Sequence, residues 1–310
     1  MNSTPPPLSG HQVRLGHGKY TADIASIGAS LRSLRFEDRD LVVPFEPDQV
    51  RPAFRGAILA PWPNRVVDGR YSFNGAEHRL SLTEPARGHA LHGLVVWEDW
   101  TIAVRSDSSA TLTCQIPAQD GYPFRLDLQV TYTLDDGGFQ TEVTATNTGT
   151  GSAPYGTAPH PYLVGGAGPV DGWVLELPAR DVLHVTEDRL IPEGVGAVAD
   201  TPSFDFRTPR LIGSTEIDHA FTGLIRESAG EVRARVTGPD GSGTAMTWGP
   251  ECPWVQIHTA DLPAPAATRV GLAVEPMTCP PDAFNTGTGL IILAPGESHE
   301  AQWTIQAITV

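Results

Sequence analysis

The sequence predicts an all-β protein, a large antiparallel β-sandwich, and three observations support this fold class. Short runs that alternate apolar and polar residues recur along the chain, the period-two pattern of strands with one buried face. The 32 glycines and 28 prolines are spread between these runs through all 310 residues, as many tight turns require. No stretch shows clear helical periodicity with an N-cap, so helices are expected to be scarce.

The strands are expected where the alternation is clearest, at residues 71–73, 100–104, 110–116, 125–134, 139–146, 173–177 and 232–237. Residues 125–134 and 139–147 flank Asp135-Asp136-Gly137-Gly138, and Asp and Gly tolerate the positive φ of tight turns, which predicts a hairpin. The polar, proline-rich residues 1–10 are expected to form a flexible tail. The rest shows no linker and no internal repeat, so residues 11–310 are expected to form a single domain.

The charge and composition narrow the classes of partner. The 36 acidic residues outnumber the 21 basic ones, the net charge is −15, and no basic run occurs, so neither nucleic acid nor an anionic membrane is expected as a partner. No window approaches eighteen consecutive apolar residues, and no signal-peptide stretch opens the chain, so a cytoplasmic protein is expected. The three cysteines fit no disulfide or zinc spacing, which suits a reducing compartment.

Five clusters of polar groups interrupt the apolar pattern, and the first two lie in the N-terminal third. Asn64 and Arg65 follow a Pro-Trp-Pro turn; an amide beside a fork of donors suits paired sugar hydroxyls, or else a structural turn. His89 and His92 stand three residues apart in a glycine-flanked segment. They could contribute to a metal site if further histidines joined them, or they could be hydrogen-bonded loop residues. The histidines available for such a set are His160, His219 and His258.

The other three clusters lie in the second half of the chain. His160 stands between two prolines, which restricts its backbone and could aim an imidazole or simply form a rigid turn. Asp218 and His219 stand between apolar residues, where the Asp could serve a site or cap a loop. Glu275 ends the apolar run 272–274, and a carboxylate there is costly unless it is paired or functional. Such a carboxylate has a raised pKa and becomes a useful base.

The order of these clusters resembles the aldose 1-epimerase (galactose mutarotase) family over most of the chain. Six motifs carry the resemblance: Asn64-Arg65, His92-Gly93, His160-Pro161-Tyr162, Asp218-His219-x-Phe221, Glu275-Pro276 and Pro281-Asp282-Ala283-x-Asn285. Three more segments match as well: residues 27–31 (Ile-Gly-Ala-Ser-Leu), 254–259 (Trp-Val-Gln-Ile-His-Thr) and 293–297 (Leu-Ala-Pro-Gly-Glu).

The resemblance implies a β-sandwich enzyme with an open cleft that interconverts the α and β anomers of a free aldose such as galactose or glucose, without a metal or cofactor. It makes Glu275 the general base and His160 the general acid, with His92 beside the ring oxygen. It makes four further residues ligands of the sugar hydroxyls and places Tyr162 in the pocket wall; these four are Asn64, Arg65, Asp218 and Gln256. A small sugar is the one expected partner, bound by a monomer or a homodimer.

The sequence departs from the family's commonest pattern at three positions. Leu94 follows His92-Gly93 where a second glycine is usual, His89 stands where many members carry Asn, and Leu163 follows Tyr162 where Phe is frequent. The acid, the base and the sugar-binding Asp are unchanged. These departures therefore concern the preferred sugar more than the activity.

Four alternatives stay open on the sequence alone. A glycoside hydrolase would use Glu275 and Asp218 as its two carboxylates but would leave the histidines unexplained. A non-catalytic carbohydrate-binding protein would keep the cleft without the chemistry. A metal-dependent isomerase or oxygenase would be built on the histidines. A sugar-phosphate mutarotase would need basic residues at the cleft rim, where the candidates are Arg51, Arg55 and Arg87.

Overall fold

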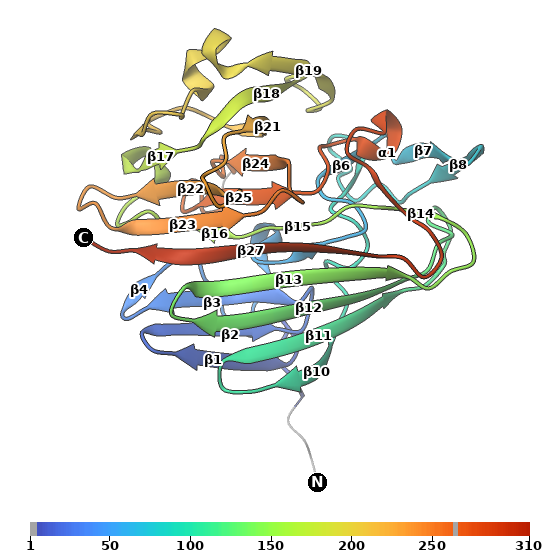
Figure 1. Ribbon diagram of the computed structural model, residues 1–310, viewed down its shortest axis with the longest axis horizontal. Helices are drawn as coiled ribbons and strands as arrows, with labels where there is room; N and C mark the ends of the chain where they lie inside the picture. Colours follow the sequence, from blue (N-terminus) through green and yellow to red (C-terminus); the bar gives the residue numbers. More distant parts are fainter. Residues whose placement is uncertain (1–4, 263–265) are drawn as a thin grey trace.

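Three antiparallel sheets make up most of this computed structural model, which describes residues 5–262 and 266–310 (Figure 1). The nine-stranded sheet has the order β10 (Thr101–Arg105), β11 (Ser109–Ile116), β12 (Leu126–Asp135), β13 (Gly138–Asn147), β27 (Ser298–Ile308), β23 (Gly243–Trp248), β22 (Val232–Thr237), β17 (Val174–Glu176) and β20 (Arg210–Leu211). The six-stranded sheet has the order β16 (Tyr162–Leu163), β25 (Leu272–Met277), β24 (Trp254–His258), β21 (Asp218–Leu224), β18 (Ala179–Val185) and β19 (Pro192–Ala197). The four-stranded sheet consists of β1 (Gln12–His17), β2 (Tyr20–Ala25), β3 (Ser30–Phe36) and β4 (Arg39–Asp40).

Short elements connect the sheets. Two-stranded ladders pair β14 (Ala153–Tyr155) with β26 (Ile291–Leu293), β15 (Ala158–Pro159) with β5 (Ile58–Leu59), β6 (Arg65–Val67) with β9 (His89–Leu91), and β7 (Arg70–Phe73) with β8 (Ala76–Arg79). Single 3₁₀ turns occur at Pro52–Phe54, Val170–Gly172, Val198–Asp200 and Pro202–Phe204. Within the described ranges the one α-helix is α1 (Ala283–Thr286), and no described helix is long and apolar enough to cross a membrane.

The expected all-β class is confirmed, and every strand expected from the alternation overlaps an observed strand. The expected hairpin is confirmed as well, because β12 pairs with β13 and Asp135 lies opposite Gly138. At the N-terminus the packed chain begins slightly before residue 11. Ser9 is buried, and both its N–H and its hydroxyl donate to the carbonyl oxygen of Pro47, at 3.0 and 2.8 Å.

The core lies between the sheets, and residue alternation decides which side chains enter it. The four-stranded sheet packs on β11, β12 and β13, which lie in front of it in Figure 1. Leu15, Ile24 and Leu34 share one buried cluster with Val130 and Tyr132 of β12. Burying one such side chain stabilises the fold by roughly 1.5–3 kcal/mol, so this face holds the two sheets together.

The six-stranded sheet contributes its other face to the site. Val255 and Ile257 of β24 and Val274 of β25 belong to the main core cluster. Successive side chains on a strand point to opposite faces, so Gln256 and Glu275 point away from this core. Both are nevertheless almost fully buried.

Candidate active site

The register of the six-stranded sheet gathers polar side chains from four sequence segments. Cross-strand partners form two adjacent rows: Asp218, His258, Ala273 and Tyr162 in one, and Ala220, Gln256 and Glu275 in the other. Direct partners on one face lie about 4.5–5.5 Å apart between Cβ atoms, so each row brings its functional groups within reach of one ligand.

A cavity of about 250 Å³ lies over these rows. All eight residues expected from the sequence line it: Asn64, Arg65, His92, His160, Tyr162, Asp218, Gln256 and Glu275. Further lining residues were not expected as part of a sugar site: Ala53, Phe54, Glu84, Leu91, His258, Asp261 and Leu262. Arg87, expected only as a rim arginine for a phosphate, lines the cavity too. The volume is close to the low end of small-ligand sites, roughly 300–1,000 Å³, and therefore suits a small polar molecule.

The loop side of the cavity has a strained backbone. Asn64 and His92 have φ of 54° and 63°, in the left-handed region that non-glycine residues seldom adopt. The His92 N–H donates to the Asn64 carbonyl oxygen at 2.8 Å, so the two residues are fixed to each other. A Cβ at Gly93 would lie 2.0 Å from the Ala60 carbonyl oxygen, which explains why glycine follows this histidine. Strained backbone of this kind is concentrated at functional sites.

His160 and Glu275 form a buried acid–base pair. His160 Nε2 lies 3.5 Å from Glu275 Oε1, and the residues are 4% and 1% exposed. Burial, with the charge of Asp218 as a smaller cause, raises the pKa of Glu275 well above its ordinary value. Burial and the neighbouring His258 lower the pKa of His160 to about 3. The raised value makes Glu275 a stronger base, and the lowered value makes protonated His160 a stronger acid.

Several buried polar atoms of this site have no protein partner within the described part of the chain. They are Glu275 Oε2, Gln256 Oε1, His92 Nδ1 and His160 Nδ1. An unpartnered buried polar atom is unfavourable, and the large majority of buried side-chain polar atoms in proteins are paired. Burial also lowers the pKa of His92 well below its ordinary value, so His92 is neutral at neutral pH. The set suits a ligand with several hydroxyl groups.

Asp218 is held as an ionised acceptor. Gln256 Nε2 donates to Asp218 Oδ1 at 2.7 Å, and an Arg65 guanidinium nitrogen lies 3.7 Å from Oδ2. Burial opposes ionisation of Asp218, but His258, Arg65 and Gln256 outweigh it and lower the pKa of this carboxyl. Asp218 and Glu275 are therefore two cavity carboxyls with opposite pKa shifts, which is how proteins separate a binding carboxylate from a basic one.

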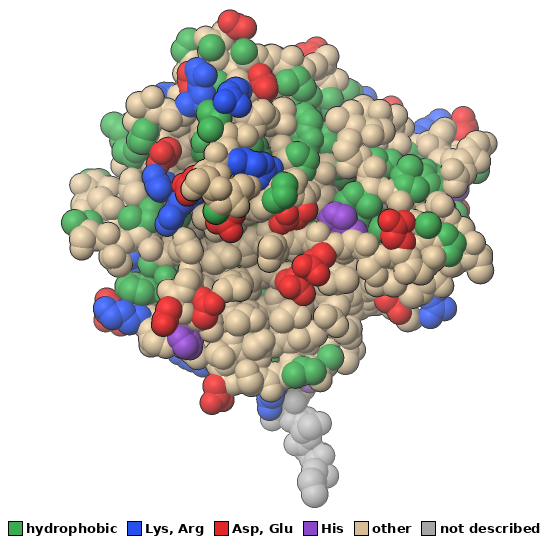
Figure 2. Space-filling view, in the orientation of Figure 1, with side chains coloured by type: hydrophobic (Ala, Val, Ile, Leu, Met, Phe, Trp, Pro, Cys, Tyr) green, Lys and Arg blue, Asp and Glu red, His purple; other side chains and the backbone are tan. Residues whose placement is uncertain are grey.

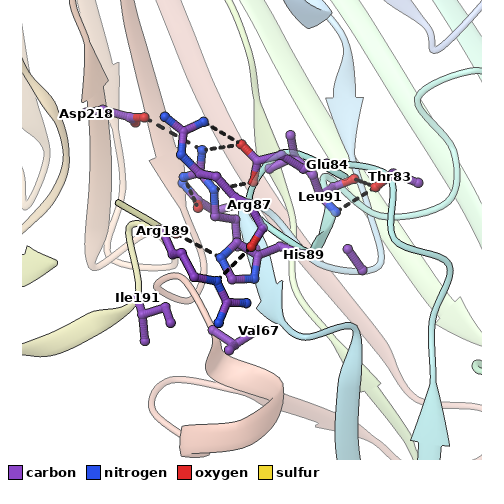
Figure 3. Close-up of polar contacts among 12 residues, drawn as sticks. Val67, Thr83, Glu84, Arg87, His89, Leu91, Arg189, Ile191 and Asp218 are labelled. Atoms are coloured by element: carbon purple, nitrogen blue, oxygen red, sulfur yellow. Dashed lines mark hydrogen bonds and ion pairs between the residues drawn. The ribbon is translucent and has the colours of Figure 1, made fainter. Parts of the chain in front are cut away.

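Glu84 lies between two arginines at the cavity wall. Arg65 donates to both carboxylate oxygens of Glu84, at 2.8 and 3.0 Å. Arg87 donates to Glu84 Oε1 at 2.9 Å, and Figure 3 labels both of these residues. Burial opposes ionisation of Glu84, but these donors outweigh it and lower the pKa of the carboxyl. Bidentate pairing fixes the Arg65 guanidinium in one orientation, with another of its nitrogens 3.2 Å from Asn64 Oδ1. No local motif marks Glu84, because its partner Arg65 lies 19 residues away.

His89 and Arg189 support this wall from behind (Figure 3). The Asp68 N–H donates to His89 Nδ1 at 3.3 Å, so Nε2 carries the proton and donates to the Arg189 carbonyl oxygen at 2.8 Å. Arg189 in turn donates to the Arg87 carbonyl oxygen at 2.9 Å and to Asp68 Oδ1 at 2.5 Å. His89 is thus a structural bridge rather than a cavity residue.

The Pro-Asp-Ala-x-Asn motif acts on the strand that carries Arg65. The Asp282 N–H donates to the Arg65 carbonyl oxygen at 2.7 Å, and its carboxylate accepts the Val67 N–H at 2.9 Å. Asn285 Nδ2 donates to the Arg70 carbonyl oxygen at 2.9 Å. The motif therefore hydrogen-bonds to β6 and to the start of β7. It positions Arg65 in this way although the motif itself does not line the cavity.

The structure corrects two groupings considered from the sequence. The five histidines do not form one set: His89 lies behind the wall, and His219 packs on Phe204 with ring centroids 4.5 Å apart. No three His, Cys, Asp or Glu side chains in residues 5–262 and 266–310 are arranged to hold a metal ion. Of the three rim arginines only Arg87 lines the cavity, because Arg51 is buried and bound by protein oxygens, while Arg55 donates to the Pro44 carbonyl oxygen.

A second hollow in the described part of the chain does not contain the expected residues. A larger hollow of about 560 Å³ lies over β10 to β13 and is lined mainly by Thr, Gln, Asp and Glu, without any expected site residue. Figure 2 shows charged side chains scattered over the face drawn there, with no continuous basic patch on it.

Comparisons with known proteins agree with this geometry. The family model described as aldose 1-epimerase matches residues 11–306. The uncharacterized protein YihR of Escherichia coli is 36% identical over 307 residues, covering 98% of this chain and 96% of YihR. The galactose mutarotase of Rattus norvegicus is 31% identical over 217 residues, covering 65% of this chain and 62% of the rat protein.

A solved structure shows the same fold. The crystal structure of a GalM/aldose epimerase homologue from C. elegans superposes with a TM-score of 0.83 at 20% identity. The match covers 96% of this chain and 99% of the C. elegans chain.

Proposed function

The chain belongs to the aldose 1-epimerase family, and we propose that it is a mutarotase that interconverts the α and β anomers of a free aldose. The observation that carries this proposal is the buried His160–Glu275 pair inside a small polar cavity. Mutarotation requires one proton to leave the anomeric hydroxyl and one to reach the ring oxygen. A base and an acid on one sugar are sufficient for both transfers.

The proton balance of the pair matches the reaction. At neutral pH the pKa shifts keep the resting pair as protonated Glu275 and neutral His160. The reactive form arises when this proton moves from Glu275 to His160 Nε2, 3.5 Å from Glu275 Oε1, which leaves Glu275 ionised and His160 protonated while the ring is closed. Ring opening moves the O1 proton to Glu275 and the His160 proton to the ring oxygen, which breaks the bond between that oxygen and C1 and leaves the free aldehyde. Rotation about the C1–C2 bond exposes the other face of the aldehyde. Both proton transfers then run in reverse, the ring closes to the other anomer, and the pair is regenerated.

The pKa shifts favour these transfers. Burial raises the pKa of Glu275 and lowers that of His160, so it stabilises the neutral arrangement reached on ring opening relative to the ion pair. General acid and general base catalysis are each worth about 10²–10⁴-fold in rate. No hydride carrier or electron sink is needed, because every proton moves between sugar and protein.

The other cavity residues bind and orient the sugar. His92 lies beside the ring oxygen of the sugar, and Tyr162 lines the pocket. The ligands of the hydroxyls are Asn64, Arg65, Asp218 and Gln256, supported by the hydrogen bonds and the ion pair that already fix them to one another. Asp218, ionised beside Arg65, accepts hydrogen bonds from sugar hydroxyls and does not act on the anomeric carbon.

Polarimetry tests the proposal. The optical rotation of freshly dissolved α-glucose and α-galactose is followed to anomeric equilibrium with and without the purified protein. Pentoses, sugar phosphates and acidic hexoses are then measured in the same way. Faster decay of the optical rotation is expected for at least one of these sugars, and the ratio of rates defines the preferred one. If none responds although calorimetry shows sugar binding, the chain is a carbohydrate-binding protein and the proposal is wrong.

A further inference from the structure

Trp97 differs from the other tryptophans of the chain. Of the seven tryptophans, six are buried, and Trp97 is 51% exposed. Single exposed apolar residues are common and need no explanation by themselves. The surroundings of Trp97 do need an explanation, because neighbouring side chains connect its indole to the cavity.

An aromatic surface runs from the cavity to Trp97. The Phe54 ring lines the cavity and lies edge-to-face against His92, with ring centroids 4.8 Å apart. The centroid of the Phe54 ring also lies 6.0 Å from that of the Trp97 ring. His92 is the residue we place beside the ring oxygen of the sugar. The aromatic surface therefore begins where the ring oxygen and its neighbouring carbon C5, which carries C6, would lie.

Trp97 is held rigidly on one face. The Arg51 guanidinium lies 4.5 Å from the centre of the indole, and Arg51 itself is buried. Arg51 donates to the carbonyl oxygens of Ile27 (3.0 Å) and Val96 and to the hydroxyl of Ser30. A cation fixed by three oxygens thus backs one face of the indole, and the half of the side chain that stays exposed is available to a ligand.

The segment that carries Phe54 is strained and tied to the acid–base pair. Ala53 and Phe54 have φ of 46° and 55°, both in the left-handed region. Such a conformation is unfavourable for a residue other than glycine and persists only when the surroundings enforce it. Here the Gly56 N–H donates to the His160 carbonyl oxygen at 2.8 Å, and the His160 N–H donates to the Ala57 carbonyl oxygen at 3.0 Å. The fold thus maintains the aromatic surface beside His160.

We propose that Trp97 is a stacking platform for a second sugar ring, so that the site takes the reducing end of a disaccharide linked through C6. This rests on the proposed function, which places the reducing ring in the cavity with its ring oxygen at His92. The C–H face of a pyranose is apolar and packs on an aromatic ring, and an indole offers a large, rigid surface for it. A substituent on C6 leaves the cavity next to Phe54, whereas one on C4 starts one ring carbon farther from the ring oxygen and from His92, and therefore leaves in a different direction.

The experiment compares glucose with glucose disaccharides in two respects, the affinity of binding and the rate of exchange between the α and β anomers. Titration calorimetry measures affinity for glucose, for the 1→6-linked isomaltose and gentiobiose, and for the 1→4-linked maltose and cellobiose. NMR saturation transfer between the anomeric protons of the reducing ring measures mutarotation of the same sugars. The variants are Trp97→Ala, Trp97→Phe, which keeps an aromatic ring, and Leu211→Ala, a control of similar exposure (58%) on β20.

We expect the 1→6-linked disaccharides to bind more tightly than glucose, and Trp97→Ala to weaken them about fivefold while glucose changes less than about twofold. Trp97→Phe should retain most of the difference, and Leu211→Ala should change nothing. Equal weakening of glucose and isomaltose by Trp97→Ala, or no preference for isomaltose over glucose, overturns the platform while mutarotation of glucose stands. Trp97-dependent binding of isomaltose without exchange of any sugar would keep the platform and reject the mutarotase.

Discussion

At the scale of single residues, the account depends on a carboxyl and an imidazole that the fold keeps out of water, 3.5 Å apart. Each has its pKa shifted in the direction that its proposed role requires. The order of the motifs along the chain was enough to predict that these two residues and six others belong to one site, and all eight line the cavity. Phe54 and Glu84 could not be predicted in the same way, because their roles come from contacts with His92 and Arg65 that no local pattern announces.

Replacing either member of the pair should abolish most activity without unfolding the protein. Glu275→Gln removes the base and His160→Asn removes the acid, so we expect kcat to fall about 10²–10⁴-fold in each variant. Polarimetry measures the rate, and a thermal melt confirms the fold. Wild-type kcat in either variant would show that the corresponding role is assigned wrongly.

Glu275→Gln should also make the protein more stable at neutral pH. Folding raises the pKa of Glu275, so the folded state favours the protonated carboxyl. The wild type therefore has its full stability only at low pH, where the carboxyl is protonated in the folded and the unfolded chain alike. As the pH rises above the ordinary value of 4.5, the unfolded chain ionises while the fold resists ionisation, and the wild type loses stability.

Glutamine cannot ionise, so its advantage should grow with pH above that value to ~1–3 kcal/mol. Urea unfolding of both proteins between pH 4 and pH 8 measures this difference. A constant difference across that range would mean that Glu275 is not held in its neutral form.

At the scale of elements, the alternation of residues predicts which side chains share a face, but not which strands are neighbours. The pattern of β24 places Gln256 and His258 on one face from sequence alone. That this face lies beside Glu275 follows from the register of β24 with β25, which depends on packing of residues far apart in the chain. The same limit applies to the support of the cavity wall by His89 and Arg189, which lie 100 residues apart.

If His89 and Arg189 position the cavity wall, variants of His89 should differ in KM according to whether they keep the hydrogen bond to Arg189. His89→Gln would keep an amide N–H near the former Nε2, within reach of the Arg189 carbonyl oxygen, whereas the side chain introduced by His89→Asn would be too short to reach it. We expect His89→Asn and Arg189→Ala to raise KM by about 2–10-fold with little change in kcat, because Arg65 binds the closed sugar and the transition state alike. His89→Gln should stay near the wild-type KM.

Arg180→Ala is the matched control, since Arg180 is an exposed residue of β18 that lines no part of the cavity. Steady-state kinetics on all four variants separates KM from kcat. If His89→Gln and His89→Asn raise KM equally, the bond to Arg189 does not position the wall.

At the scale of the whole molecule, the class could be predicted and the topology could not. Alternation and turn residues indicated an antiparallel sandwich, and the structure has one. The position of β27 was not predictable, because this last strand lies in the middle of the nine-stranded sheet, between β13 and β23 (Figure 1). Its Trp303 and Ile305 are buried in the main core. Such long-range pairing is decided by the assembled core rather than by local sequence.

This topology makes the end of the chain essential for folding. A chain that stops after Glu297 would lack β27 and leave two central strand edges unpaired, so we expect it to aggregate or stay unfolded. A chain that stops after Ile308 loses only the exposed Thr309 and Val310 and should fold normally. Circular dichroism and thermal melts distinguish the two. A cooperative native melt of the shorter chain would contradict the central role of β27.

The most direct test of the central claim is the exchange between the anomers of a sugar at equilibrium, measured by NMR saturation transfer on the preferred aldose. The wild type should transfer saturation between the α and β anomeric protons, and Glu275→Gln should bind the sugar without doing so. Exchange that survives Glu275→Gln undiminished would contradict the claim that this buried carboxyl opens the ring.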